Sequence, residues 1–348
     1  MVALHVLFVI AGILLVLATW QSIIVTIILP RRTRNWIAVT GWVATYYVLT
    51  ALAQRARDPA RKDAILALLG PVNIVGLLGT WMLLFGVGFG FVMWGTEAAS
   101  FWDSLDLAGS SIFTLGFATG KTPFSHFLTD LAAASGMIVV GLQIGYLPTI
   151  YGAYSQREAL VTLTSMRCSE GNGVLTGASV LRNHPLPASA DLLRSLFASW
   201  EASAAAIIES HTNYPWLIAF RSPRASESWV TSMLAILDAI SLLQAIGPSS
   251  LPLEAEHCRF ACTTTFRSLS EMLRPRETFP RHRDALSYEA FASAVEGAIA
   301  PALVERDVED AWPIFRAARA GYESYALELA AYMWLPIPAK AWLRPVAT

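Results

Sequence analysis

The chain carries little charge for its length. Only 15% of its 348 residues are Asp, Glu, Lys or Arg, whereas 55% are hydrophobic and the mean hydropathy is +0.48. An ordinary soluble domain has about 25% charged residues, so this composition indicates membrane segments. The net charge of −1 gives no reason to expect a polyanionic partner, and we predict no nucleic-acid binding.

Cysteines and catalytic motifs are also scarce. The three cysteines, Cys168, Cys258 and Cys262, are odd in number and lack paired spacing, which argues against a disulfide framework and fits a reducing compartment. Cys258 and Cys262 would lie one turn apart on a helix, but no second pair of zinc ligands is near, so we interpret them as buried core residues. No Walker loop, dinucleotide-binding glycine run or Ser/His/Asp pattern occurs. We therefore predict neither an enzymatic activity nor a cofactor or bound metal.

The few acidic residues divide the chain into two halves. Nearly all of them lie after Gly95, and most of the first 150 residues are apolar. Segments 2–29, 72–94 and 127–151 are long enough to cross a bilayer core of about 30 Å at about 1.5 Å per residue. The first of them lacks the positive n-region of a signal peptide and is longer than one. We expect a multi-pass protein of the plasma membrane with its C-terminal half in the cytoplasm.

Segment 35–54 has two interpretations. It is apolar enough to be a transmembrane span, yet it lies between basic clusters at 31–34 and 55–62. If it crossed the membrane, one cluster would lie outside, against the positive-inside rule. A helix lying in the interface keeps both clusters inside, with its Trp and Tyr side chains at the level of the lipid headgroups. We favour the interfacial helix, which makes membrane lipid its partner.

A short uncharged loop, "SSIFTLGFATGKTP" at 110–123, lies between the second and third spans. The residues before it, 101–113, have helical character but are too few to cross the membrane. A half-crossing helix followed by a loop that returns is a re-entrant arrangement, and such backbone survives only where it lines water or ions or is buried in protein. Two spans of one chain cannot surround it, so several copies would have to meet on a symmetry axis.

This order of span, short helix, Thr-x-Gly-aromatic loop and glycine-containing span covers about residues 72–155. It resembles the pore module of the tetrameric potassium-channel superfamily. The resemblance implies a homotetramer with potassium ions in its pore and a selectivity filter of backbone carbonyls. It also implies that the Thr114 hydroxyl adds an ion ligand and that Phe117 packs behind the filter strand. The matching filter residues are Thr114, Leu115, Gly116, Phe117 and Ala118.

Two residues depart from the pattern of that superfamily, because Ala118 replaces the second filter glycine and Thr119 replaces the aspartate that usually follows. In addition, Lys121 near the outer mouth would repel cations. If position 118 needs a left-handed conformation, Ala costs about 1–2 kcal/mol there, or roughly 4–8 kcal/mol over four subunits. Three functions therefore stay open: a potassium channel, a poorly selective cation channel, and a membrane-anchored sensor or scaffold that does not conduct.

The third span contains the candidate hinge and gate residues Gly136, Gly141, Gly145, Leu147, Pro148, Ile150 and Tyr151. The glycines permit bending, although small residues also serve close helix packing in membranes. Pro148 removes a helix hydrogen bond and would splay the cytoplasmic end of the span. The three large apolar side chains could form a constriction that closes by dewetting.

The C-terminal half reads as helical. Apolar residues recur at three- and four-residue intervals in 188–211, 227–246, 258–274, 287–306 and 307–333. The Ser-His, Tyr-Pro, Phe-Arg-Ser and Ser-Trp series within 209–230 resembles bacterial ion-channel-like membrane proteins with a helical soluble domain, and it supplies no ligand. His211 in this stretch either lines a ligand pocket or packs as part of a helix end.

We therefore predict an all-α membrane protein, a tetrameric channel pore with an additional N-terminal span and an α-helical cytosolic domain whose ligand is unknown. The domains are a transmembrane span at 1–34, interfacial or cytoplasmic helices at 35–70, a pore domain at 71–155, a linker at 156–187 and the helical domain at 188–348.

Overall fold

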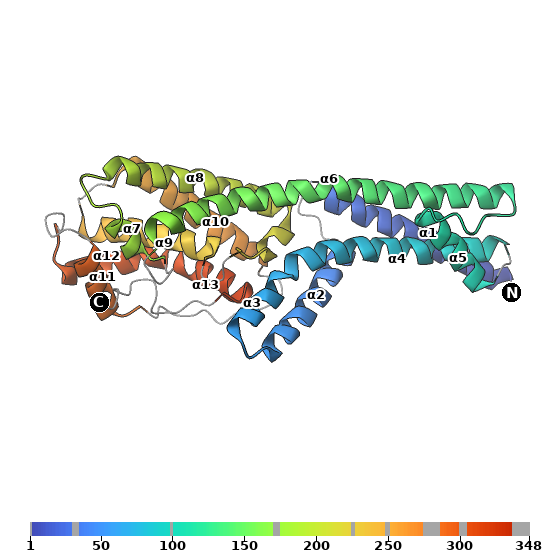
Figure 1. The fold of residues 1–348 in the computed structure, drawn as a ribbon, viewed down its shortest axis with the longest axis horizontal. Coiled ribbons are helices and arrows are strands. Elements are labelled where there is room, and N and C mark those ends of the chain that lie inside the picture. The colour runs from blue at the N-terminus through green and yellow to red at the C-terminus, as the bar shows by residue number, and fades with distance from the viewer. Residues whose placement is uncertain are drawn as a thin grey trace. The chain divides into compact units, whose positions relative to one another are not determined.

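The computed structural model describes residues 2–29, 35–97, 100–169, 175–223, 227–247, 251–273, 286–298 and 305–335. Within these ranges every regular element is a helix and no strand occurs, so the all-α prediction is confirmed there. The chain divides into two compact units, Met1–Gly152 and Ala153–Thr348. Figure 1 draws the helices of both units.

Two long apolar helices lie side by side in the first unit. Helix α1 (Val2–Ile23) ends in the π-helical turn η1 (Ile24–Ile28) and packs along α4 (Leu69–Glu97). Small residues allow the close approach, since a Cβ atom added to Gly88 would lie only 2.9 Å from Cγ2 of Val16. Membrane helices commonly pack through glycines in this way.

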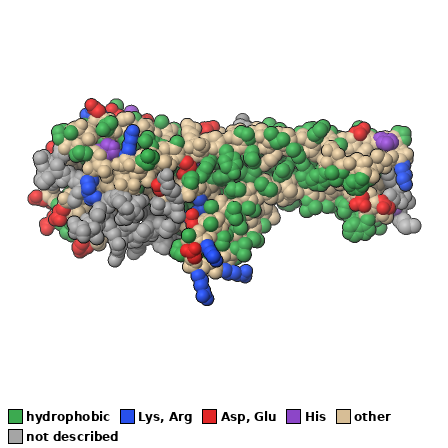
Figure 2. Space-filling model, viewed as in Figure 1, with side chains coloured by type: hydrophobic (Ala, Val, Ile, Leu, Met, Phe, Trp, Pro, Cys, Tyr) green, Lys and Arg blue, Asp and Glu red, His purple; other side chains and the backbone are tan. Residues whose placement is uncertain are grey.

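Helices α2 (Trp36–Arg55) and α3 (Pro59–Ala67) precede α4 and contact each other. The Asn35 amide ties the start of α2 to the end of α1, because it donates to the hydroxyls of Ser22 and Thr26 at 2.8 and 2.6 Å. Figure 2 shows Lys and Arg side chains at the end of this helix pair, beside a surface rich in hydrophobic side chains. The neighbouring basic cluster at 31–34 lies outside the described residues.

Among the described residues, five helical segments are long and apolar enough to cross a membrane, namely Ala3–Ile28, Trp36–Arg55, Pro59–Thr96, Pro123–Cys168 and Trp229–Ile246. Such a set fits a multi-pass membrane protein. The last segment is almost wholly buried within the second unit, whereas the first exposes most of its side chains. The length and composition of α2 suit a span as well as an interfacial helix, so its interfacial position stays a prediction.

Helix α6 (Pro123–Cys168) is a single helix of 46 residues that passes from the first unit into the second. The helix continues through Pro148, and the splaying that we expected of the cytoplasmic end of the span stays a prediction. Proline removes one hydrogen bond, here to the carbonyl of Ile144, and its ring is accommodated on an exposed part of the helix.

The prediction of a linker at 156–187 was wrong for most of the residues described there, because they form helices. Residues up to Cys168 continue α6, whose buried positions recur at three- and four-residue intervals from Arg157 onward. A second helix, α7 (Gly177–Arg182), is buried from Gly177 to Leu181. Both segments belong to the second unit and contribute to its core, and residues 170–174 lie outside the described ranges.

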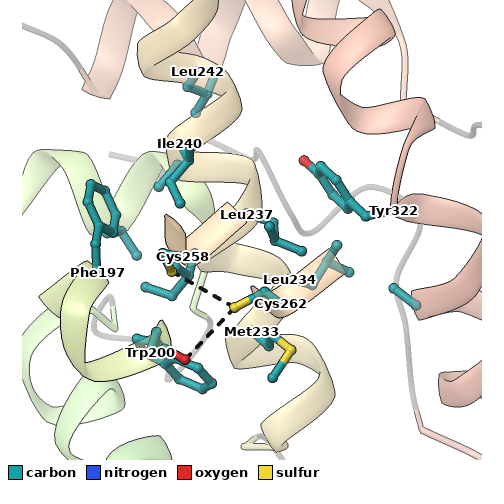
Figure 3. Packing of buried hydrophobic residues seen from close by; sticks show 14 of the residues in the cluster. Phe197, Trp200, Met233, Leu234, Leu237, Ile240, Leu242, Cys258, Cys262 and Tyr322 are labelled. Carbon is teal, nitrogen blue, oxygen red and sulfur yellow. Dashed lines mark hydrogen bonds between the residues drawn. The ribbon is translucent and has the colours of Figure 1, made fainter. Parts of the chain in front are cut away.

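Helix α9 (Trp229–Ile246) forms the centre of the second unit. All but two of its 18 residues are buried, as expected of a helix that is hydrophobic on every side. It contacts α7 and four further helices, namely α8 (Ala190–Asn213), α10 (Leu253–Leu273), α12 (Val308–Ala320) and α13 (Glu323–Tyr332). Figure 3 shows Trp200 of α8, Met233 of α9 and Cys262 of α10 meeting in this core.

The helical segments predicted for this half are largely confirmed. Segments 188–211, 227–246 and 258–274 correspond to α8, α9 and α10, and 287–306 begins as α11 (Tyr288–Ala298). Segment 307–333 was expected as one helix and is two, because α12 ends at Ala320, next to Gly321, and α13 begins at Glu323.

Candidate functional site

Helix α5 (Phe101–Ile112) is the short helix that leads into the candidate filter, and it confirms the helix expected at 101–113. Its start is capped by Ser100, whose hydroxyl accepts the backbone N–H of Asp103 at 3.1 Å. Twelve residues extend about 18 Å, well short of the bilayer core. Helix α5 packs on α4 at Gly90, where an added Cβ atom would contact Cδ1 of Leu105 at 3.4 Å.

A tight turn ends α5 and begins the candidate filter. Thr114 has a φ of +52°, and its N–H donates to the carbonyl of Ser111 at 3.0 Å. The N–H of Leu115 donates to the carbonyl of Ser110 at 2.8 Å. These two bonds form a Schellman motif, whose left-handed position is usually taken by glycine. A threonine at this position costs about 1–2 kcal/mol, so the turn is strained at the first filter residue.

The sign of φ alternates along the candidate filter. It is positive at Thr114 and again at Gly116, where it is +74°, and negative at Leu115 and Phe117. Alternation in the sign of φ can turn successive peptide groups the same way along a chain, and a filter of backbone carbonyls requires such an orientation. A row of carbonyl oxygens on one side is the arrangement that replaces the hydration shell of a cation in a filter.

The alternation stops at Ala118, which does not adopt a positive φ. Its backbone is held by Ser110 of α5 instead. The Ala118 N–H donates to the Ser110 hydroxyl oxygen at 3.1 Å, and the hydroxyl lies 3.3 Å from the Ala118 carbonyl oxygen, to which it donates. The carbonyl of Ala118 is therefore turned toward α5, and Ala118 does not meet the left-handed strain considered from the sequence. Ser110 was not identified from the sequence.

The large side chains of the candidate filter are exposed to solvent in the single chain. Leu115 is 63% exposed and Phe117 is 66% exposed. The expectation that Phe117 packs behind the strand is therefore not met inside this chain. The short side chain of Ser110 takes the position behind the loop, where it bonds the backbone directly.

The candidate hinge glycines of α6 have different surroundings. Gly136 faces the end of α5, where an added Cβ atom would overlap the carbonyl oxygen of Ile112. Gly136 is therefore required for close contact between the two helices. No atom lies within 4 Å of a Cβ atom added to Gly141 or Gly145, so these two glycines face open space in the chain.

The candidate gate residues are only partly brought together. Leu147, Pro148 and Tyr151 are exposed, as are Gly141 and Gly145. Ile150 is fully buried. The proposed constriction therefore cannot include Ile150, because its side chain contributes to the interior of the first unit instead.

The charges around the loop are few. The last turn of α5 carries no basic residue, and the negative end of its helix dipole adjoins Thr114. Asp103 lies in the first turn of the same helix, and the side chain of Lys121 is exposed after the loop. The end of α5 at which the filter begins thus favours a cation, whereas Lys121 opposes one unless its side chain points away.

A second polar cluster surrounds Arg157, on the part of α6 that belongs to the second unit. Arg157 is 3% exposed and donates from Nε to Oε1 of Glu158 at 2.8 Å. It also donates to the carbonyls of Leu217 and Phe220 at 3.1 and 2.7 Å. Its Nη1 lies 3.1 Å from Nε2 of His211. His211 therefore does not line an open pocket, because it packs at the end of α8 against α6.

The cysteines lie in the core of the second unit. All three are buried and unpaired, and the Sγ atoms of Cys258 and Cys262 are 3.9 Å apart. Cys262 also lies 4.0 Å from the carbonyl oxygen of Trp200, as Figure 3 shows. The described residues contain no group of three or more His, Cys, Asp or Glu side chains arranged to hold a metal ion.

Neither a protein-family model, nor a curated protein, nor a solved structure matches this chain. The geometry of the loop after α5 and of its surroundings is therefore the guide to what the protein does.

Proposed function

We propose that this chain is one subunit of a homotetrameric cation channel that conducts potassium. The loop from Thr114 to Phe117 supplies the selectivity filter of each subunit, α5 is its pore helix, and α4 and α6 are the outer and inner helices. The helical second unit regulates the gate. The resemblance of the sequence to the potassium-channel pore module motivates this assignment.

One observation carries the proposal. A helix too short to cross the bilayer ends in a strained left-handed Thr114, and the positive φ recurs two residues later at Gly116. Strained backbone of this kind persists where the surrounding structure fixes it, and it concentrates at functional sites. A row of carbonyls at the negative end of a helix dipole suits a dehydrated monovalent cation.

The exposed residues of one chain support assembly around an axis. Leu115 and Phe117 of the loop, and Gly141, Ile144 and Tyr151 on α6, are uncovered in the single chain. In a tetramer these residues would face neighbouring subunits or the central pore. Polar loop backbone at membrane depth would then be buried by protein or line the ion pathway, as it must be in a bilayer.

A poorly selective cation channel is the second candidate, and Ala118 favours it. The Ala118 carbonyl is bonded to the Ser110 hydroxyl and is therefore not free to coordinate an ion with the filter carbonyls that we propose from Thr114 onward. A filter with fewer coordinating oxygens discriminates less between potassium and sodium. The exposed Lys121 would weaken cation entry in either case.

The proposed topology places the protein in the plasma membrane. Helices α1, α4 and the first part of α6 span the bilayer, α2 lies at the inner interface, and the second unit is cytoplasmic. The basic residues of the α2–α3 pair then lie on the cytoplasmic side, in agreement with the positive-inside rule. Helix α9 stays in the core of the cytoplasmic unit.

The assignment is tested by purified protein reconstituted in planar bilayers, with Gly116→Ala as the key variant. Its φ of +74° strains any L-residue, so an alanine in each of four subunits should cost about 4–8 kcal/mol and abolish or greatly reduce the current. The matched control is Gly79→Ala on α4, where an added Cβ atom meets nothing within 4 Å of it and should leave the current unchanged.

Native mass spectrometry on the same preparations reports the number of subunits. A tetramer whose current is lost in Gly116→Ala and kept in Gly79→Ala supports the proposal. A monomer, or a current that both variants carry equally, would overturn the assignment of the filter. A tetramer that never conducts favours the alternative of a membrane-anchored sensor or scaffold.

A further inference from the structure

Arg157 joins α6 to the rest of the second unit. Its guanidinium is buried, and its partners come from three places: Glu158 on α6 itself, His211 at the end of α8, and the carbonyls of Leu217 and Phe220. The aromatic ring of Trp229, at the start of α9, lies 5.7 Å from the guanidinium carbon. This one side chain thus connects α6 with α8, with the turn η2 (Pro215–Ala219) and its C-cap residue, and with α9.

The hydrogen bonds of His211 fix its protonation state. Its Nδ1 lies 2.9 Å from the carbonyl oxygen of Ile207, which can only accept, so Nδ1 carries the proton. The remaining nitrogen, Nε2, faces Nη1 of Arg157, which can only donate. The contact therefore requires a neutral imidazole with its lone pair on Nε2.

A proton on Nε2 would turn this hydrogen bond into a repulsive contact. Two N–H groups and two positive charges would then face each other in a buried site. Burial and the charge of Arg157 accordingly hold the pKa of His211 well below its usual value of 6.5. The other groups that face the imidazole are the Ser210 hydroxyl and the uncharged Trp229 ring.

Glu158 does not offset a charge on His211 directly. Its Oε1 is engaged by both Nε and Nη2 of Arg157 at 2.8 Å, on the Arg157 atoms that do not contact the imidazole. The charge balance of the cluster is therefore one arginine and one glutamate with His211 neutral. It becomes one positive charge in excess when His211 is protonated.

We propose that the Arg157–His211 contact is an acid-released joint, in which protonation of His211 detaches α6 from α8 and frees the segment 153–168. The sign follows from the contact, since folding with an intact joint excludes a proton that the unfolded chain accepts near pH 6.5. The joint is complete above that pH and is lost as the pH falls through the lower value that His211 has in the folded protein. The joint itself does not depend on ion conduction, whereas an effect on the gate depends on the proposed channel function.

Hydrogen exchange of the full-length protein in detergent tests the joint without measuring a current. Amide exchange in 153–168, corrected for the intrinsic effect of pH, is followed from about pH 7.5 to about pH 4.5. Exchange should become about tenfold faster or more in acid in the wild type. His211→Gln keeps an acceptor toward Arg157 that does not titrate, and should remove the acid-induced change.

His257→Gln is the matched control, because His257 is a half-exposed histidine on α10 and not a partner of Arg157. It should keep the wild-type pH profile. The joint is refuted if exchange in the wild type is insensitive to acid, or if His211→Gln keeps the same acid-induced change as the wild type.

Solid-state NMR of histidine nitrogens in the wild-type protein provides a second measurement that needs no substitution at His211, should that variant not fold. The proposal requires a neutral ring with the proton on Nδ1 at about pH 7.5 and a doubly protonated ring after the exchange transition. A ring protonated on Nε2 at neutral pH would contradict it.

Discussion

The hydroxyl of Ser110 bonds the backbone of Ala118 at both its N–H and its carbonyl. Its Oγ lies 3.1 Å from the Ala118 nitrogen and 3.3 Å from the Ala118 carbonyl oxygen. The two residues are eight positions apart, and the strained turn at Thr114 brings them together. One buried serine of the short helix thereby fixes the far end of the candidate filter. The relationship explains how an alanine can stand at this position without a left-handed backbone.

Replacing this serine tests that bracing role. In Ser110→Ala, the partly buried N–H and carbonyl of Ala118 lose their partner, and we expect a loss of about 1–3 kcal/mol in the stability of the loop. The filter should become less ordered and its selectivity should fall. Reversal potentials under opposed potassium and sodium gradients measure this change, and Ser111→Ala is the control, because its hydroxyl bonds only within α5. Equal selectivity of the two variants would contradict the bracing role of Ser110.

Ala118→Gly tests the effect of the departure from the usual filter sequence. Glycine adopts positive φ readily, so the backbone could continue the alternation that stops at this position. The carbonyl at 118 would then join the row, and we expect the ratio of potassium to sodium permeability to rise. A variant whose permeability ratio equals that of the wild type would show that the bond to Ser110, and not the alanine, sets the end of the filter.

The two kinds of glycine on α6 should respond differently to substitution. Gly136→Ala puts a methyl group against the Ile112 carbonyl, and overpacking of this kind costs about 1–3 kcal/mol. In Gly141→Ala the new methyl group meets no atom beyond the local helix backbone within 4 Å and should leave the subunit's stability nearly unchanged. Thermal unfolding in detergent compares the two variants, and equal unfolding temperatures would contradict the contact between α5 and α6.

The buried thiols should be unreactive while the second unit is folded. The hydrogen bond to Cys258, together with burial, raises the pKa of Cys262 well above its usual value of 9.0, so this thiol is neutral near pH 7. The thiolate is the reactive form, and we expect no maleimide labelling of Cys258 or Cys262 before denaturation. Mass spectrometry of the labelled protein measures this, with a surface cysteine introduced by Ser199→Cys as the positive control, because Ser199 is exposed. Rapid labelling of the native wild type would contradict the buried pair.

Local patterns predicted much of the fold. The helix at 101–113 was predicted because its helical character is encoded within a few adjacent residues, and the structure adds Ser100 as its cap. The same holds for α8 and α10, whose buried positions recur at helical spacing. The loop of Thr114 and Gly116 was singled out because it is short and uncharged between two apolar segments and because it resembles the filter of the potassium-channel superfamily.

The features that the sequence missed depend on distant contacts or on context. The bond between Ser110 and Ala118 exists only once the turn at Thr114 has formed. The contacts of Arg157 join residues more than 50 positions apart. Local sequence patterns do not report such contacts, so core residues within 156–187 were assigned to a linker.

The proposed potassium channel is best tested by the reversal potential of the wild-type protein in a planar bilayer with opposed potassium and sodium gradients. We predict a value near the potassium equilibrium potential, carried by the carbonyls from Thr114 to Phe117. A value near zero would assign the poorly selective channel instead. A current that reverses at the chloride equilibrium potential would contradict the account, because a filter of backbone carbonyls cannot select an anion.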